Sequence, residues 1–115
     1  MEQQQQQTML YEGMYVLNAM LNDEARTKTF EKIKEGITSR GGEIVKVHDQ
    51  GRRRLAYEIK KQREGYYYLL YFRLPPEHVK ELWNEYHLNE HLLRFLTIRT
   101  DNVLEELSFK QLPEQ

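Results

Sequence analysis

The stretch that decides the fold is DQGRRRLAYEIKKQREGYYYLLYFRL, residues 49–74. Within it, Leu55, Tyr57 and Ile59 alternate with polar, charged or small residues, the period of two that is typical of a strand with one buried face. A polar turn that contains a glycine is expected at residues 60–65. The rest of the stretch is apolar or aromatic at nearly every position, as in a central strand. The stretch therefore predicts a β-hairpin.

Positive charge is concentrated in this hairpin. Between residues 46 and 63 there are seven Lys or Arg and two acidic residues, a local balance of +5, whereas the whole chain carries −1. Such a run is typical of a solvated hairpin tip, and equally of a surface that binds phosphate. Because the total charge is close to zero, the chain is not a general polyanion binder, and any nucleic-acid contact is expected to be a local patch.

The composition is that of one small globular domain. The 115 residues are long enough for one apolar core. No apolar run reaches the length of a membrane helix, and the beginning of the sequence does not resemble a secretion signal. Cysteine is absent, which excludes disulfides and thiolate metal sites. We therefore expect a cytoplasmic protein.

The remaining elements follow from local signals. Residues 1–8 are rich in glutamine and are expected to form a disordered tail. Asn22 or Asp23 can cap a helix whose apolar face recurs at helical spacing, and Gly51 is expected to mark a bulge. The predicted order is a strand at 9–20, a helix ending before Gly41, strands at 43–59 and 66–74, a helix from Pro75, a strand at 92–100 and a partly disordered C-terminal extension at 101–115.

The order βαββαβ predicts a ferredoxin-like α+β sandwich over residues 9–100, with a four-stranded antiparallel sheet and two helices on one face. In this topology the first and third strands are central. The second strand, which carries the basic residues, lies at an edge. Its backbone N–H and C=O groups are then available to a strand from a partner.

Two alternative sites need to be considered. Residues 64–71 and 14–18 partly match the two short motifs of the RNA-recognition-motif domain, in which Tyr15, Tyr66 and Tyr68 would lie on the open sheet face and stack on bases of single-stranded RNA. His87, Glu90 and His91 match the H-x-x-E-H pattern of zinc hydrolases. These three residues straddle a predicted helix end without a clear third ligand, so surface histidines are the favoured interpretation. We find no set of catalytic residues and expect neither an enzyme nor a cofactor.

The hairpin also resembles a known family. Residues 51–57, followed by Ile59, Lys61 and residues 65–67, match the pattern G-R-R-x-L-A-Y-x-I-x-K-x-x-x-G-Y-Y of the bacterial ribosomal protein S6 family. The similarity covers residues 9–100 and includes Tyr11-Glu12. The chain departs from the family at three positions, which are Leu10, Gln50 and Glu58.

The resemblance implies a non-enzymatic structural constituent of the small (30S) ribosomal subunit, in the cytoplasm. It further implies that the chain binds 16S ribosomal RNA cooperatively, as a heterodimer with ribosomal protein S18. The residues that this implies for the partner interface are Val45, Val47, Leu55 and Tyr57. Those that it implies for RNA are Arg94 and Arg99 in the last strand, and Arg52, Arg53 and Arg54 where the partner and the RNA meet.

Overall fold

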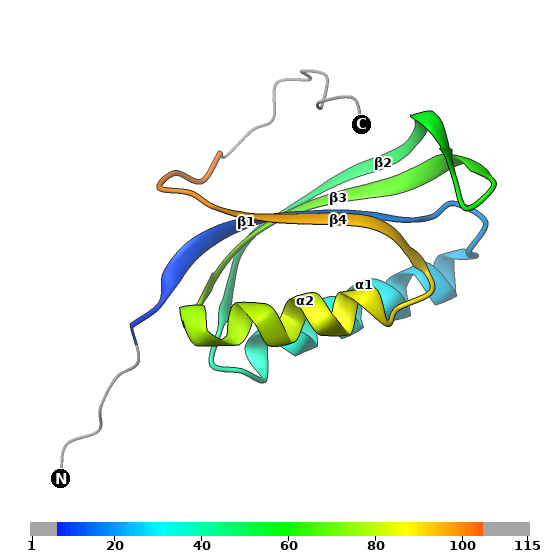
Figure 1. Cartoon of the computed structure of the whole chain (residues 1–115). Helices are drawn as coiled ribbons and strands as arrows, with labels where there is room; N and C mark the ends of the chain where they lie inside the picture. The colour runs from blue at the N-terminus through cyan, green and yellow to red at the C-terminus, as the bar shows by residue number, and fades with distance from the viewer. Residues whose placement is uncertain (1–6, 105–115) are drawn as a thin grey trace, which may run out of the picture.

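The computed structural model describes residues 7–104, which form a four-stranded antiparallel sheet with two helices on one face (Figure 1). The strand order is β2-β3-β1-β4, so β1 and β3 are central and β2 and β4 are edges, and the predicted ferredoxin-like fold is confirmed. The predicted tails lie outside the described residues, apart from 7–8 and 101–104. The elements are β1 (Met9–Asn18), α1 (Asp23–Thr38), β2 (Glu43–Ile59), β3 (Gln62–Leu74), the 3₁₀ turn η1 (Pro76–His78), α2 (Val79–His87) and β4 (Leu92–Arg99).

Helix α1 begins where the sequence predicts. The Asn22 side-chain oxygen accepts a hydrogen bond from the Ala25 backbone N–H at 2.8 Å, and Asp23 and Glu24 occupy the first turn. Both features stabilise the helix start, because the cap satisfies an unpaired N–H group and the carboxylates lie at the positive end of the helix dipole. The helix then buries a face of Phe30, Ile33 and Ile37 against the sheet.

The core between the helices and the sheet is almost completely inaccessible to solvent. Side chains from β1 and β3 that point toward the helices are essentially inaccessible to solvent, and they pack with the apolar faces of α1 and α2. Burying a large apolar side chain of this kind contributes about 1.5–3 kcal/mol. The strand residues of this helix-side core include Tyr15, Leu17, Leu70, Phe72 and Leu74.

The opposite face of the sheet is also apolar. It carries a second cluster, made of Met14, Val16, Leu55, Tyr67, Leu69, Tyr71 and Leu93. The chain itself covers part of this face, because Val103 packs against the cluster and the Leu104 carbonyl lies 2.7 Å from Nε2 of His48 on β2. The face that the sequence indicated as open is therefore partly closed by the end of the described chain.

The β2–β3 hairpin is tighter at its turn and more irregular along β2 than expected. The turn consists of Lys60 and Lys61, with φ of 51° and 65°, and β3 begins at Gln62. The prediction of a six-residue turn at 60–65 is therefore wrong. Positive φ at both turn residues gives the twist that suits a two-residue hairpin. The bulge at Gly51 is confirmed: its φ is 76°, and the strand register shifts between Asp49 and Gly51.

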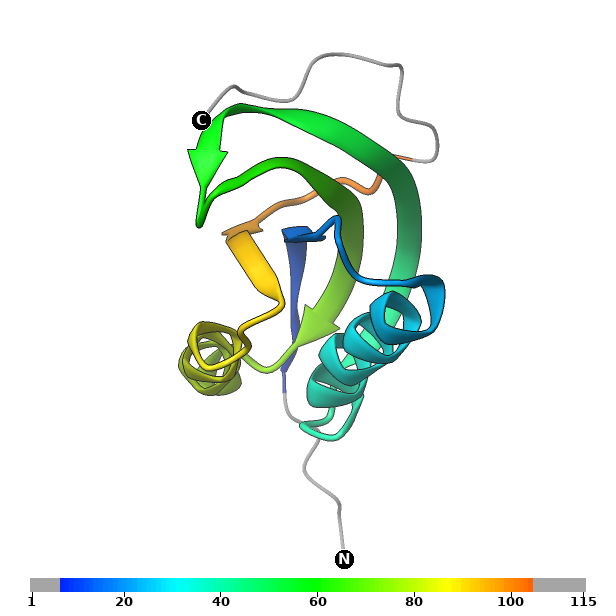
Figure 2. The same ribbon diagram turned by 90° about the vertical axis from the view of Figure 1, so that its right-hand side faces the viewer.

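A larger irregularity lies between Arg54 and Ile59, where β2 has more residues than β3. Such insertions bend a strand and increase its twist. Figure 2 shows the result, since the tip of the hairpin curls over the sheet toward β4.

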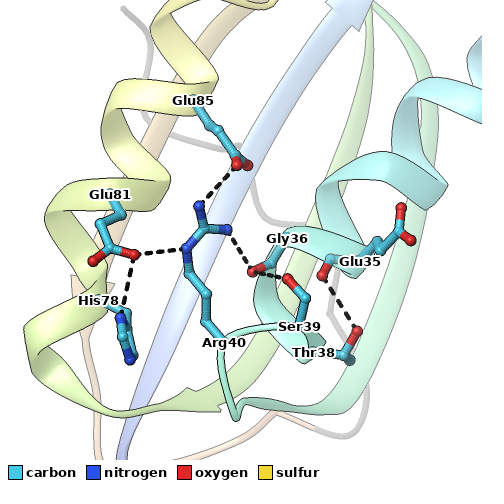
Figure 3. Close-up of polar contacts among 8 residues, drawn as sticks. All are labelled: Glu35, Gly36, Thr38, Ser39, Arg40, His78, Glu81 and Glu85. Atoms are coloured by element: carbon cyan, nitrogen blue, oxygen red, sulfur yellow. Dashed lines mark hydrogen bonds and ion pairs between the residues drawn. The ribbon is translucent and has the colours of Figure 1, made fainter.

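The side chain of Arg40, just beyond α1, joins the two helices (Figure 3). Its Nε donates to Oε1 of Glu81 at 2.9 Å, and its Nη2 donates to Oε2 of Glu85, also at 2.9 Å. The third nitrogen, Nη1, donates to the Gly36 carbonyl at 2.9 Å. One guanidinium group thus connects the end of α1 to two successive turns of α2, a geometry that lysine cannot reproduce.

We expect Arg40→Ala to lower the midpoint of thermal unfolding by a few degrees at neutral pH. Arg40 is the main cause of a lowered pKa at Glu81, relative to the ordinary 4.5. A carboxyl with a lowered pKa in the folded state stabilises the fold above its unfolded pKa, and this contribution disappears as the pH falls through the folded value. The difference between variant and wild type should therefore shrink below about pH 4.5.

Thermal unfolding followed by circular dichroism at about pH 7 and about pH 3 measures this difference. Lys28→Ala removes a far more exposed cation, 3.9 Å from Glu24, and serves as the control with little expected effect. An equal midpoint difference at both pH values would contradict a role for the two carboxylates.

Candidate nucleic-acid interface

Strand β2 presents the edge that a partner strand could extend. Within residues 7–104 it pairs only with β3, and it is the longest strand, at 17 residues. Val45 and Val47 are apolar and exposed on it, by 40% and 38%. Leu55 differs, because it is only 8% exposed and packs in the second core cluster. The structure thus favours a core role for Leu55 over the partner contact that the resemblance implied.

The three consecutive arginines have different surroundings. Arg52 is held by its own chain, since Nη1 lies 3.2 Å from Oε1 of Glu64 and Nη2 donates to the Ala19 carbonyl at 2.9 Å. Arg53 is half-buried. Arg54 is exposed and lines a shallow hollow under the hairpin tip. Of the three, Arg54 is placed best to meet an external phosphate.

Arg94 on β4 reaches the hairpin tip. Its Nη1 donates a hydrogen bond of 3.0 Å to the hydroxyl of Tyr57, although β2 and β4 are opposite edges of the sheet. The resemblance implied Arg94, in the last strand, as an RNA contact separate from the basic run on the second strand. The structure instead brings them together because the hairpin curls over the sheet, as Figure 2 shows.

Other cations complete a basic hairpin tip, which we define as Arg54, Lys60, Lys61, Arg63 and Arg94. Lys60 and Lys61 are exposed at the turn, and Arg63 is exposed beside them. One nearby acid, Glu58, accepts from Nε of Arg63 at 3.4 Å. A second acid, Glu64, pairs in register with Arg54 and contacts Arg52. Five cations against these two carboxylates leave the tip positive. The residues predicted to contact RNA did not include Lys60, Lys61 or Arg63, although all three lie within the basic run that the charge count singled out.

Arg99 lies apart from the basic hairpin tip. It pairs in register with Tyr11 on β1, and its Nη2 lies 3.1 Å from the sulfur of Met9. Arg99 is exposed and is the last residue of β4. The two arginines predicted in the last strand therefore do not form one site.

The three tyrosines of the RNA-recognition-motif hypothesis face the helices. Tyr15 is fully buried and its hydroxyl lies 2.9 Å from that of Tyr86. Tyr68 stacks on Phe30 of α1, with ring centroids 3.9 Å apart. Tyr66 is covered by the Arg26 guanidinium at 4.0 Å, and burial raises its pKa. The hypothesis of a base-stacking sheet face is therefore wrong for these residues.

The zinc-hydrolase pattern is not assembled. The described residues contain no group of three histidines or acids that could hold a metal. The ring of His87 packs edge-on against Trp83, with centroids 4.0 Å apart, and lies near Phe95.

Neither helix of residues 7–104 is long and apolar enough to cross a membrane.

Fold and surface together define a small ferredoxin-like α+β protein with an exposed sheet edge and a basic hairpin tip. A family model described as ribosomal protein S6 matches residues 10–99. The small ribosomal subunit protein bS6 of Protochlamydia amoebophila is 61% identical over 92% of this chain and 93% of its own length. That of Chlamydia abortus is also 61% identical, over 93% and 96%.

A solved structure shows the same architecture. The crystal structure of 30S ribosomal protein S6 from Thermotoga maritima superposes with a TM-score of 0.77 at 36% identity, over 82% of this chain and 89% of that one. The chain belongs to the ribosomal protein S6 family, as its hairpin indicated. It is therefore a structural, non-enzymatic constituent of the small ribosomal subunit.

Proposed function

We propose that this chain binds 16S ribosomal RNA cooperatively with ribosomal protein S18, in the cytoplasm, by pairing along the edge of β2. The observation that carries the proposal is the coexistence of an exposed edge strand and a basic hairpin tip on a chain whose net charge is −1. A chain that is neutral overall gains little from long-range attraction to RNA. A partner that adds its own charge beside the tip would complete the binding surface.

The partner-facing part is the first half of β2. Val45 and Val47 expose apolar surface there, next to backbone groups that a further strand could pair with. Strand addition of this kind draws affinity from main-chain hydrogen bonds and specificity from side chains that alternate along the edge. Arg52 and Arg53 follow along the same strand, and we expect them to lie where the partner meets the RNA.

The RNA-facing part is the basic hairpin tip, with Arg99 as a separate contact. Arginine and lysine bind phosphate oxygens without reading sequence, so such contacts recognise the shape of a folded RNA. Each phosphate that is neutralised releases counterions, and the affinity should therefore fall steeply with salt.

The test is an electrophoretic mobility shift of a 16S ribosomal RNA fragment at two salt concentrations, with this chain alone, S18 alone and both together. We expect tight, salt-sensitive binding only with both proteins. A Val47→Asp variant, which places a charge on the partner-facing edge, should weaken the joint complex while leaving the fold intact. Equal binding by this chain alone would contradict the cooperative mechanism.

A further inference from the structure

We propose that Tyr57 is a base-stacking residue, which receives an unpaired nucleotide of the bound RNA at a hollow formed by the two strands of the hairpin. The proposal rests on the RNA binding proposed above and specifies what kind of RNA element the basic hairpin tip takes. It moves Tyr57 from the partner interface, where the family resemblance placed it, to the RNA interface.

The ring of Tyr57 is exposed but held in place. Its side chain lies in the irregular part of β2, where the backbone leaves regular pairing with β3, and 52% of the residue is accessible. The hydroxyl accepts a hydrogen bond from Nη1 of Arg94 at 3.0 Å. An exposed aromatic ring with an anchored hydroxyl loses little conformational entropy when a ligand covers its face.

A hollow adjoins this ring. Its volume is about 240 Å³, and residues on both strands of the hairpin form it. Two exposed guanidinium groups lie on its wall, and the carboxylate of Glu58 provides a hydrogen-bond acceptor beside them. The lining residues are Arg54, Leu55, Ala56, Tyr57, Glu58 and Arg63.

This combination matches the chemistry of an unpaired nucleotide. The base of the nucleotide can stack on the tyrosine ring, and its exocyclic amino group can donate to Glu58. The phosphates of the nucleotide can pair with Arg54 and Arg63. A base inside a duplex has no free face for such a contact. The site therefore selects a bulged or looped nucleotide.

The surroundings favour RNA over a protein partner. Tyr57 accepts a hydrogen bond from Arg94 and lines the same hollow as Arg54 and Arg63. The exposed apolar residues Val45 and Val47 lie at the other end of β2. Trp83 on α2 is almost equally exposed, at 49%, but its ring packs on His87 and Phe95 on the helix side of the sheet. Trp83 is thus the natural control for an exposed aromatic that has no role in RNA binding.

The experiment compares Tyr57→Leu, Tyr57→Phe and Trp83→Leu in the complex of the full chain with S18 and the 16S RNA fragment. Tyr57→Leu should weaken RNA binding by about 5- to 150-fold, the usual range for loss of one stacked base. Tyr57→Phe keeps the ring and should retain most of the affinity, and Trp83→Leu should have no effect. Circular dichroism confirms that each variant is folded.

Two further readouts separate stacking from other roles. Loss of a stacked base should leave the salt dependence of RNA binding unchanged, whereas loss of a phosphate contact in Arg54→Ala should reduce its slope by about one. The affinity for S18 alone should not change in Tyr57→Leu. Wild-type RNA affinity of Tyr57→Leu, or a loss confined to S18 affinity, would overturn this inference alone. Failure of the wild-type pair to bind the RNA would overturn the proposed function as well.

Discussion

Replacement of Tyr15 by alanine should lower the free energy of unfolding by about 3–5 kcal/mol, the cost of removing a large aromatic side chain from a core. Tyr15 is completely inaccessible, and its ring meets that of Tyr86 edge-on with centroids 5.2 Å apart. Domains of this size are stable by only about 5–15 kcal/mol, so the variant should be partly unfolded at 37 °C or in mild denaturant. Urea titration followed by circular dichroism measures the loss.

Tyr15→Phe is the matched control, because it keeps the ring and removes only the hydroxyl that lies 2.9 Å from the Tyr86 hydroxyl. We expect it to cost about 1 kcal/mol. A variant Tyr15→Ala that remained fully stable but no longer bound RNA would restore the sheet-face hypothesis. The structure predicts the opposite pattern, a loss of stability with RNA binding retained by whatever fraction is folded.

The same pair of tyrosines predicts a dependence of stability on alkaline pH. Burial raises the pKa of Tyr86 to about 12 and that of Tyr15 well above its ordinary 10.0. The folded state therefore favours the protonated hydroxyls, and their contribution is fully present below pH 10.0 and is lost as the pH rises toward about 12.

The order of the elements could be predicted because most of the boundaries have a local cause, although the start of β3 was placed too late. Asn22 caps α1, Gly51 takes the positive φ of a bulge, and the apolar face of α1 recurs at helical spacing. These signals depend on near neighbours along the chain. The topology then follows from general rules of handedness and of strand order.

Which face of each central strand points toward the helices could not be predicted in the same way. Alternation identifies the buried face of a strand only when the other face is polar, and here β1 and β3 are apolar on both faces. The sequence therefore contained no signal to place Tyr15, Tyr66 and Tyr68 on one side or the other. The sequence also could not show that the irregular stretch between Arg54 and Ile59 brings Tyr57 to Arg94, because that contact depends on how far the hairpin curls.

Charge reversal at the half-buried Arg94 should have the largest effect on RNA binding of any single substitution in the basic hairpin tip. Arg94→Glu would remove a cation from the basic hairpin tip, place a carboxylate there and release the hydroxyl of Tyr57, to which Arg94 now donates. Like charges brought together at an interface cost several kcal/mol. We therefore expect an affinity for the 16S RNA fragment, in the presence of S18, that is lower by about a hundredfold or more at low salt.

Arg94→Ala separates the two contributions. It removes the cation without adding repulsion, so its loss should be smaller, and the salt dependence of binding should fall by about one released counterion. Lys28→Ala on α1 removes a cation from the helix side and should bind RNA like the wild type. If Arg94→Ala and Lys28→Ala, which each remove one positive charge, weakened binding equally, the effect would come from net charge alone. A loss specific to Arg94 would instead locate the RNA at the meeting point of β4 and the hairpin tip, which exists only because β2 is irregular between Arg54 and Ile59.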